Sequence, residues 1–597
     1  MCNMKNKWLL LSLSILGISA ASCKKDFLQR NPQTEISPEQ FFKTPADLST
    51  YVNGFYDKQL SSPYDDANSD NISSYTGSEM DKLVRGAITP NTIGGWDDWG
   101  QLRRVNFMLD NVYKTQGDPT EIAHYIGVAR YFRAKFYFAK IATYSDVPWY
   151  GHALSDTDSS MYKARDPRAA VADSVLDDLQ YAVDHLKEKD GNGTRVNKYA
   201  ALALMSRFGL FEGTFRKYHP ELKLESSAEK FLNVAVTAAE KIMNSNKFSI
   251  YKSGDGAASY RALFVSTSLE NNPEILQWRD YQASLGVGNN THTVLGWVWS
   301  LSQSLANSYL MKDGTSFTSI AGYDKIGFVG SFANRDPRMA ETIAYPGFST
   351  TKNDILYVAK PNLGGYDQLK FYPRDPELRK GWELNYTALP IYRFAEVLLN
   401  YAEAKAELGK LTQSDIDQTI NKLRSRVDMP AMDMGTANSQ IDPVLDNAYQ
   451  NVTGANKGVI LEIRRERRVE TACEGLRAND VNRWAAGKLL NEAPKGMYVP
   501  AIGAIDMTGD DVPDIAILPS PTDTASIANI PWEKKKNMGR YYLTENFYLE
   551  NGTSGHIMFV ADRAGREFKM PQYYYRPIPQ DQIVLNRKLQ QILGWEK

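Results

Sequence analysis

The residues of this chain that come nearest to a catalytic set are carboxylates in the run ILEIRRERRVETACEGLRANDVNRW, residues 460–484. Glu466 and Glu470 lie four positions apart, and a pair of carboxyl groups is the usual requirement for cleaving a glycosidic bond. A general acid needs a raised pKa, whereas the arginines beside these glutamates would lower the pKa of each. Two groups on one helix face also do not flank a bond from opposite sides. The run therefore predicts no catalytic residue.

The same run has the periodicity of a helix with two stripes. Val469, Ala472, Cys473 and Leu476 form an apolar stripe. Six charged residues form a stripe of mixed sign: Arg467, Glu470, Glu474, Arg477, Asp480 and Arg483. Two interpretations remain open. The stripe is either a solvated face, whose pairs contribute about 0.3–0.5 kcal/mol each, or a half-buried structural ion-pair network in which Gly475 lets another backbone approach.

Other motifs for chemistry are few. Asp506 to Asp514 carries carboxylates at alternate positions, as calcium loops do, but lacks the glycine at the sixth place and the glutamate at the twelfth. We interpret this segment as a polar hairpin tip and predict no metal site. The six histidines are scattered, and the sequence contains no phosphate-binding loop, HExxH or GxSxG motif. No cofactor is predicted.

Helical patterns dominate the elements that would position these residues. Amphipathic segments separated by Gly, Pro or polar turns predict helices over these ranges: 97–113, 121–144, 169–187, 196–215, 228–244, 389–408 and 415–427. Residues 273–278 read as a strand within a loop-rich stretch. We therefore expect a mainly α protein of stacked tetratricopeptide-like helical hairpins, with long loops and a few short strands.

Composition excludes several classes of protein. The 69 basic and 70 acidic residues of this 597-residue chain balance, so no nucleic-acid partner is expected. Only Cys473 lies beyond the first 23 residues, so the body of the protein forms no internal disulfide framework. Its place on the apolar stripe makes Cys473 a small core residue.

The N-terminus predicts export and a lipid anchor. Lys5 and Lys7 precede an apolar run from Trp8 to Ala21, too short to span a bilayer. Small residues then lead to Cys23, as in a bacterial lipoprotein, so residues 1–22 are a signal peptide and Cys23 is the lipidation site. Two or more acyl chains make a durable anchor. The expected domains are a tether with the first helix start (23–45), an N-terminal helical region (46–250) and a C-terminal region (251–597) forming one compact unit with it.

Several segments, in order, resemble the SusD/RagB family. The run at 460–484 matches its ER…E…EG.R..D..RW signature, and GVARYFRAKFYFAKIATYSDVPWY (127–150), NRDPR (334–338) and PIYRFAEVLLNYAEAKAELG (390–409) resemble further family elements. The ending resembles the family's Y..PIP…GW, with Ile592-Leu593 where Asn-Pro is usual. The resemblance covers the mature chain and implies a non-catalytic, surface-exposed outer-membrane lipoprotein. Such a protein binds oligosaccharide and delivers it to a SusC-like TonB-dependent transporter.

Under that resemblance, a ligand would meet aromatic side chains in polar loops, because sugar rings pack on Trp and Tyr faces. The candidates are Trp96, Tyr281, Trp297 and Trp299, while Trp99 is expected to anchor its helix in the core. Three alternatives remain: an uptake lipoprotein for peptides, a secreted glycosidase, and a helical-repeat scaffold that binds only protein.

Overall fold

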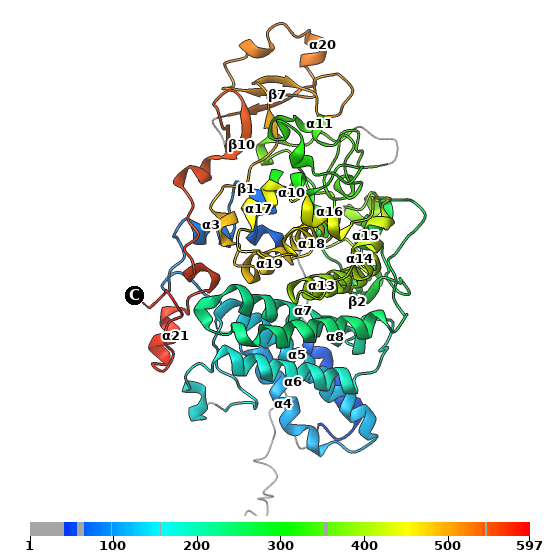
Figure 1. Cartoon of the computed structure of the whole chain (residues 1–597), viewed down its shortest axis with the longest axis vertical. Coiled ribbons are helices and arrows are strands. Elements are labelled where there is room, and N and C mark those ends of the chain that lie inside the picture. The colour runs from blue at the N-terminus through cyan, green and yellow to red at the C-terminus, as the bar shows by residue number, and fades with distance from the viewer. Residues whose placement is uncertain are drawn as a thin grey trace, which may run out of the picture.

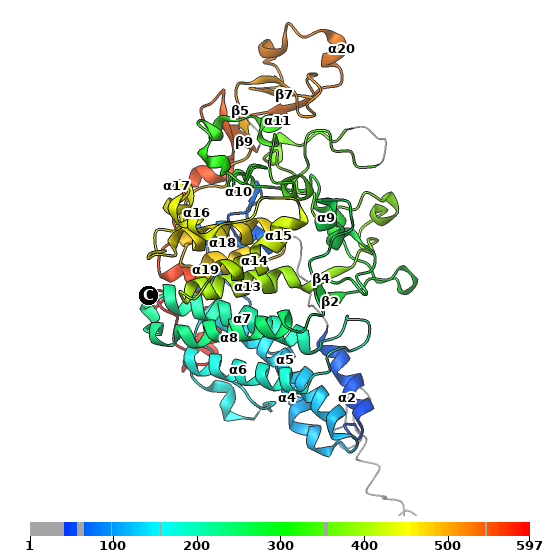
Figure 2. The same cartoon turned by 45° about the vertical axis from the view of Figure 1, so that its right-hand side comes forward.

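The computed structural model describes residues 41–56, 65–96, 98–155, 157–351, 356–543 and 546–596. The predicted signal peptide and Cys23 lie outside the described residues, as does most of the tether. Helices form the lower and middle layers in Figures 1 and 2, and short strands with α20 form the upper end. The expectation of a mainly α protein with helical hairpins and few short strands is confirmed.

The helices of the described residues have the following bounds. They are α2 (Pro45–Val52), α3 (Glu79–Val84), α4 (Gly100–Asn111), α5 (Pro119–Tyr144), α6 (Arg168–His185), α7 (Lys198–Tyr218), α8 (Ala228–Met243), α9 (Ala258–Val265), α10 (Gln303–Ser308), α11 (Phe328–Ser331), α12 (Arg338–Thr342), α13 (Phe394–Glu407), α14 (Gln413–Gln418), α15 (Ile420–Arg426), α16 (Met434–Ser439), α17 (Pro443–Ala448), α18 (Lys457–Glu470), α19 (Arg477–Arg483), α20 (Trp532–Lys535) and α21 (Gln580–Leu585).

The strands are short and form four small sheets. They are β1 (Ile72–Ser74), β2 (Ile275–Arg279), β3 (Trp299–Leu301), β4 (Leu389–Arg393), β5 (Tyr498–Val499), β6 (Gly503–Ile505), β7 (Ile515–Leu518), β8 (Gly539–Tyr542), β9 (Phe547–Leu549) and β10 (Gly555–Phe559). The sheet orders are β1-β3, β2-β4, β5-β10-β9 and β6-β7-β8, and all pairs are antiparallel except β7 with β8.

Helices α5 to α8 pack consecutively as hairpins, and α13 lies against α7 and α8. Two glycines one turn apart set the closest approach. A Cβ on Gly209 would lie 2.7 Å from the Ala235 nitrogen, and one on Gly213 would lie 2.7 Å from the Leu232 side chain. Since only glycine permits this spacing, α7 and α8 pack backbone to backbone, and the predicted helices at 196–215 and 228–244 are confirmed as one hairpin.

The helix predicted over 389–408 begins five residues later than expected. Residues 389–393 form β4, which pairs antiparallel with β2, and the Phe394 amide donates to the Glu274 carbonyl at 2.7 Å. Pairing with β2 thus overrides the helical pattern of these residues.

Two large apolar clusters fill the interior of the described residues. One joins helices from both sides of residue 250, including α5, α7, α13 and α18, and the other lies under the loops and strands of the second half. The domain boundary at 250 stays a prediction. Within the described residues, no helix combines the length and the apolar character needed to cross a membrane.

Candidate functional site

The charged run at 460–484 is two helices rather than the single helix predicted. α18 ends at Glu470 and α19 begins at Arg477, and Cys473 and Gly475 between them have positive φ values of 64° and 73°. The buried carboxylate of Asp66 accepts hydrogen bonds from the backbone N–H of Cys473 at 2.6 Å and of Gly475 at 3.1 Å. These hydrogen bonds from a distant segment stabilise the turn between α18 and α19. Local periodicity could not predict this turn.

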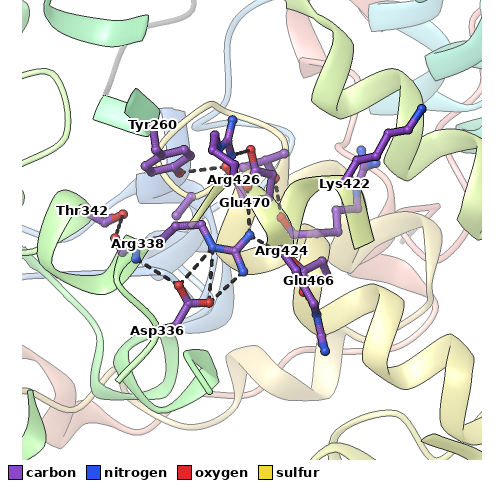
Figure 3. A network of polar contacts seen from close by, with 12 residues as sticks. Tyr260, Asp336, Arg338, Thr342, Lys422, Arg424, Arg426, Glu466 and Glu470 are labelled. Atoms are coloured by element: carbon purple, nitrogen blue, oxygen red, sulfur yellow. Dashed lines mark hydrogen bonds and ion pairs between the residues drawn. The ribbon is translucent and has the colours of Figure 1, made fainter. Parts of the chain in front are cut away.

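Glu470 is the centre of the buried network in Figure 3. Arg393 contacts one of its carboxylate oxygens at 2.7 Å, Arg338 contacts the other at 2.9 Å, and Arg426 forms a third ion pair. Burial alone would raise the pKa of Glu470, but these three arginines outweigh it and lower the pKa. A carboxylate held ionised in this way is a poor general acid.

The remaining members of the predicted stripe are also paired. Arg467 and Arg483 contact Asp480 at 2.9 and 2.8 Å, and Arg477 contacts Asp70 at 2.7 Å. Glu474, which keeps slight exposure, pairs with Lys370 and Arg393. The structure therefore contradicts the solvated-face interpretation and shows an interior network.

The segment from Asp506 to Asp514 joins β6 to β7 as a hairpin tip. Asp506 accepts hydrogen bonds from the backbone N–H of Thr508, Gly509 and Asp511, and Asp514 accepts them from Met507 and Thr508. Its carboxylates stabilise the turn itself. In the described part of the chain, no three His, Cys, Asp or Glu residues gather as metal ligands.

Three of the four aromatic candidates are buried and expose little of their rings at the surface: Trp96, Tyr281 and Trp299. Trp96 packs edge-on against Trp99 and Tyr144. The indole N–H of Trp299, in β3, donates to Gln368 at 3.0 Å. The polar sequence around these residues suggested exposure, but long-range packing covers them.

Trp96 and Trp99 also line a cavity of about 400 Å³ between α4, the 148–162 loop and α21. Most of its wall is apolar, and its other aromatic members are Tyr150 and Tyr162. It is separate from the loops that carry Trp297.

Trp297 is the fourth candidate, and it is 52% exposed. Its partner is Trp382, which is 59% exposed, with ring centroids 6.3 Å apart and planes at 40°. Trp382 is not among the residues predicted from the sequence. The signal that could have found it is its place in the polar loop Arg379–Glu383, directly after Gly381.

Two loops, residues 282–298 and 374–386, carry the pair and are fastened together. Asn289 and Asn385 exchange backbone hydrogen bonds of 2.8 and 3.1 Å, and the Asn385 side chain donates to Thr291 at 2.8 Å. A Cβ on Gly288 would lie 2.1 Å from the Glu383 carbonyl oxygen, so only glycine lets the loops approach this closely. The two loops lie beside β2 and β4, at the right of Figure 2, and give the tryptophans a prearranged support.

Other exposed apolar side chains lie on the loops that carry the tryptophan pair. Leu285, Val287 and Leu384, on the same two loops, are exposed. Two adjacent indole faces can stack on flat, weakly polar faces of a ligand. The pair supplies contact area and orientation.

The chain matches the sequence profile described as "SusD family" over residues 266–595, more than half of its length. Residues 26–210 match a second profile, described as "Starch-binding associating with outer membrane". SusD-like protein P2 of Formosa agariphila is 23% identical over 513 residues, covering 83% of this chain and 92% of that protein.

Solved structures share the fold. A SusD-like protein from Bacteroides fragilis aligns with a TM-score of 0.67 at 20% identity, covering 95% of this chain and all of that one. A protein described as a laminarin-binding SusD-like protein aligns with a TM-score of 0.55 at 17% identity, covering 92% and 100%. With the profile match and the shared signature at 460–484, this chain belongs to the SusD family.

Proposed function

We propose that this protein captures oligosaccharide at the outer surface of the cell and passes it, uncleaved, to a SusC-like TonB-dependent transporter. The observation that carries the proposal is the exposed Trp297–Trp382 pair on two fastened loops. Leu285, Val287 and Leu384 on the same loops are exposed too, and an exposed apolar patch marks a binding surface. Two indoles side by side can each stack on a sugar ring.

Relatives support an oligosaccharide as the ligand class. One structural neighbour is described as laminarin-binding, and another, from Bacteroides fragilis, as a SusD-like carbohydrate-binding protein. The absence of cleavage is supported by the charged run, since three arginines lower the pKa of Glu470 and hold its carboxylate ionised.

The outer membrane is supported as the location by the profile match over residues 26–210. The anchor would be acyl groups on Cys23. Mass spectrometry of the protein purified from its native membrane should find residue 23 as the N-terminus with acyl mass added. An unmodified Cys23 would remove the anchor from the proposal.

A peptide is the second candidate ligand. Leu285, Val287 and Leu384, exposed on the same loops as the tryptophans, provide apolar contacts for amino-acid side chains. The glycan proposal expects signal on a glycan array and none on a peptide array probed with the mature protein. The reverse pattern would favour the peptide.

The decisive variants are Trp297→Ala and Trp382→Ala, measured by calorimetry with the oligosaccharide that gives the strongest array signal. Each should weaken binding at least about tenfold, about 1.4 kcal/mol, because each removes a central stacking surface. Trp532→Ala is the matched control. Trp532 is 67% exposed and lies on α20, between β7 and β8, away from the two loops that carry the tryptophan pair. Equal affinity in all three variants would refute the site.

A further inference from the structure

The loop that carries Trp297 is joined to the segment at residues 357–360 through Gly296. The Gly296 carbonyl accepts a hydrogen bond from the Lys360 ammonium at 2.8 Å. Gly296 has a φ of 62°, and a Cβ there would lie 2.4 Å from the Tyr357 hydroxyl. The residue before Trp297 therefore rests directly on the 357–360 segment.

That segment is in turn held by one carboxylate. Asp367, which is fully buried, accepts hydrogen bonds at the same oxygen from the Tyr357 hydroxyl at 2.7 Å and the Lys360 backbone N–H at 3.0 Å. Its other carboxylate oxygen has no hydrogen-bond partner within the described ranges. The next residue, Gln368, accepts from Trp299, so residues 296–299 and 357–368 are joined at two points.

We propose that Asp367, through Tyr357 and Lys360, positions Trp297 for its ligand and releases it when the carboxylate is protonated. This inference rests on the proposed function and adds regulation of the same site by pH. Hydrogen bonds to an ionised acceptor are shorter and about twice as strong as neutral ones. Protonation would weaken both bonds to Asp367 and remove its attraction for Lys360.

The environment of Asp367 places its protonation in a pH range that the folded protein can be tested in. Burial raises the pKa of Asp367 to about 6, while the hydrogen bonds from Tyr357 and Lys360 act in the opposite direction. Tyr541, on β8, is the other titratable group facing it in the described structure. Near Trp297 itself lies His292, whose pKa burial and Arg379 lower from its usual value.

A raised folded-state pKa also means that the charge of Asp367 disfavours folding. The destabilisation begins as the pH rises above the pKa of Asp367 in the unfolded chain, and it is complete above about pH 6. A carboxylate that costs stability at neutral pH fits a role in holding the loop rather than in holding the fold. Asp367→Asn should therefore leave the melting temperature at pH 7 unchanged or higher.

The test follows Trp297 directly, by fluorine NMR of protein labelled with 5-fluorotryptophan, with the resonance assigned through Trp297→Phe. In the wild type this resonance should shift between pH 7.5 and 5 with a midpoint near 6. In Asp367→Asn the shift should be absent, whereas His292→Gln should keep it. A midpoint unchanged in Asp367→Asn, or a shift abolished by His292→Gln, would overturn the inference.

Affinity for the oligosaccharide that gives the strongest array signal separates the two proposals. Lys360→Met and Asp367→Asn should weaken binding at pH 7.5 several-fold and flatten its pH dependence, with the protein still folded. If Trp297→Ala weakens binding but these two variants do not, only the positioning role fails. If Trp297→Ala binds as well as the wild type, the binding site itself fails.

Discussion

The charged network around Glu470 and the loops around Trp297 show two ways in which this chain fixes a side chain. Glu470 is held by arginines from three separate elements, α12, β4 and α15, and is fully buried. Trp297 is held through the backbone of its neighbour Gly296 and through contact with Trp382, and about half of its side chain is left in solvent. The first arrangement is redundant and rigid, and the second leaves contact surface free for a partner.

This difference assigns the two regions different roles. A buried ion pair gains little net stability over an apolar core, but removing one partner leaves uncompensated charge inside the protein. The network therefore fixes which elements meet at the centre of the fold. The loops depend on few contacts, so changes there should alter binding before they alter folding.

The largest effect expected is from Glu470→Ala, which leaves three buried arginines without their shared carboxylate. Loss of one partner from a buried network costs about 3–5 kcal/mol. Denaturant unfolding of the variant should show this loss, or the protein should fail to fold. A loss under about 1 kcal/mol would mean that the network is not central.

Acid should act on the same region through its carboxylates. Burial alone would raise the pKa of Glu403, but Arg483 and neighbouring arginines lower it to about 2 from the model-compound value of 4.5. The pairing therefore contributes stability above pH 4.5 that is lost as the pH falls through 2, on the order of 3 kcal/mol. Melting temperatures measured across this window should fall steeply in the wild type and less in Glu403→Gln. If the melting temperatures of the wild type and Glu403→Gln fell in parallel with pH, Glu403 would not be the group responsible.

Gly288→Ala probes the support of the loops. Its new Cβ would lie 2.1 Å from the Glu383 carbonyl, so the two loops must separate. We expect oligosaccharide affinity to fall at least severalfold, with a stability loss of about 1–2 kcal/mol. The control is Gly94→Ala, where a Cβ meets nothing within 4 Å. Equal affinity in both variants would show that loop spacing does not matter.

The smallest effect on stability is expected from an ion pair at the surface. Glu533 and Lys536, on and just after α20, form an ion pair with both side chains largely in solvent. Glu533→Gln should change stability by less than about 0.5 kcal/mol. A larger change would undermine the contrast between buried and exposed charges.

Much of the fold followed from local pattern. Helices α5 to α8 appear within a few residues of their predicted bounds, because Gly, Pro or polar turns mark where each helix begins and ends. Local pattern failed where a distant segment decided the outcome. Residues 389–393 became β4 because β2 lies beside them, and the chain turns at Cys473 because Asp66 binds its backbone.

The candidate site was predictable only in part. Trp297 is exposed as expected, but Trp96, Tyr281 and Trp299 lie in polar sequence and are nevertheless covered by other segments. Trp382 was missed because its partner is 85 residues away in the sequence, and the two loops meet through long-range contacts such as the Asn289–Asn385 pairing. Local polarity indicates loops, but not which side of a loop faces solvent.

A crystal structure of the mature protein with its strongest oligosaccharide ligand tests the central claim most directly. We predict sugar rings stacked on Trp297 and Trp382, with the glycosidic bonds intact and the Glu470 network unchanged. A sugar bound elsewhere, such as in the cavity beside Trp96 and Trp99, would contradict it.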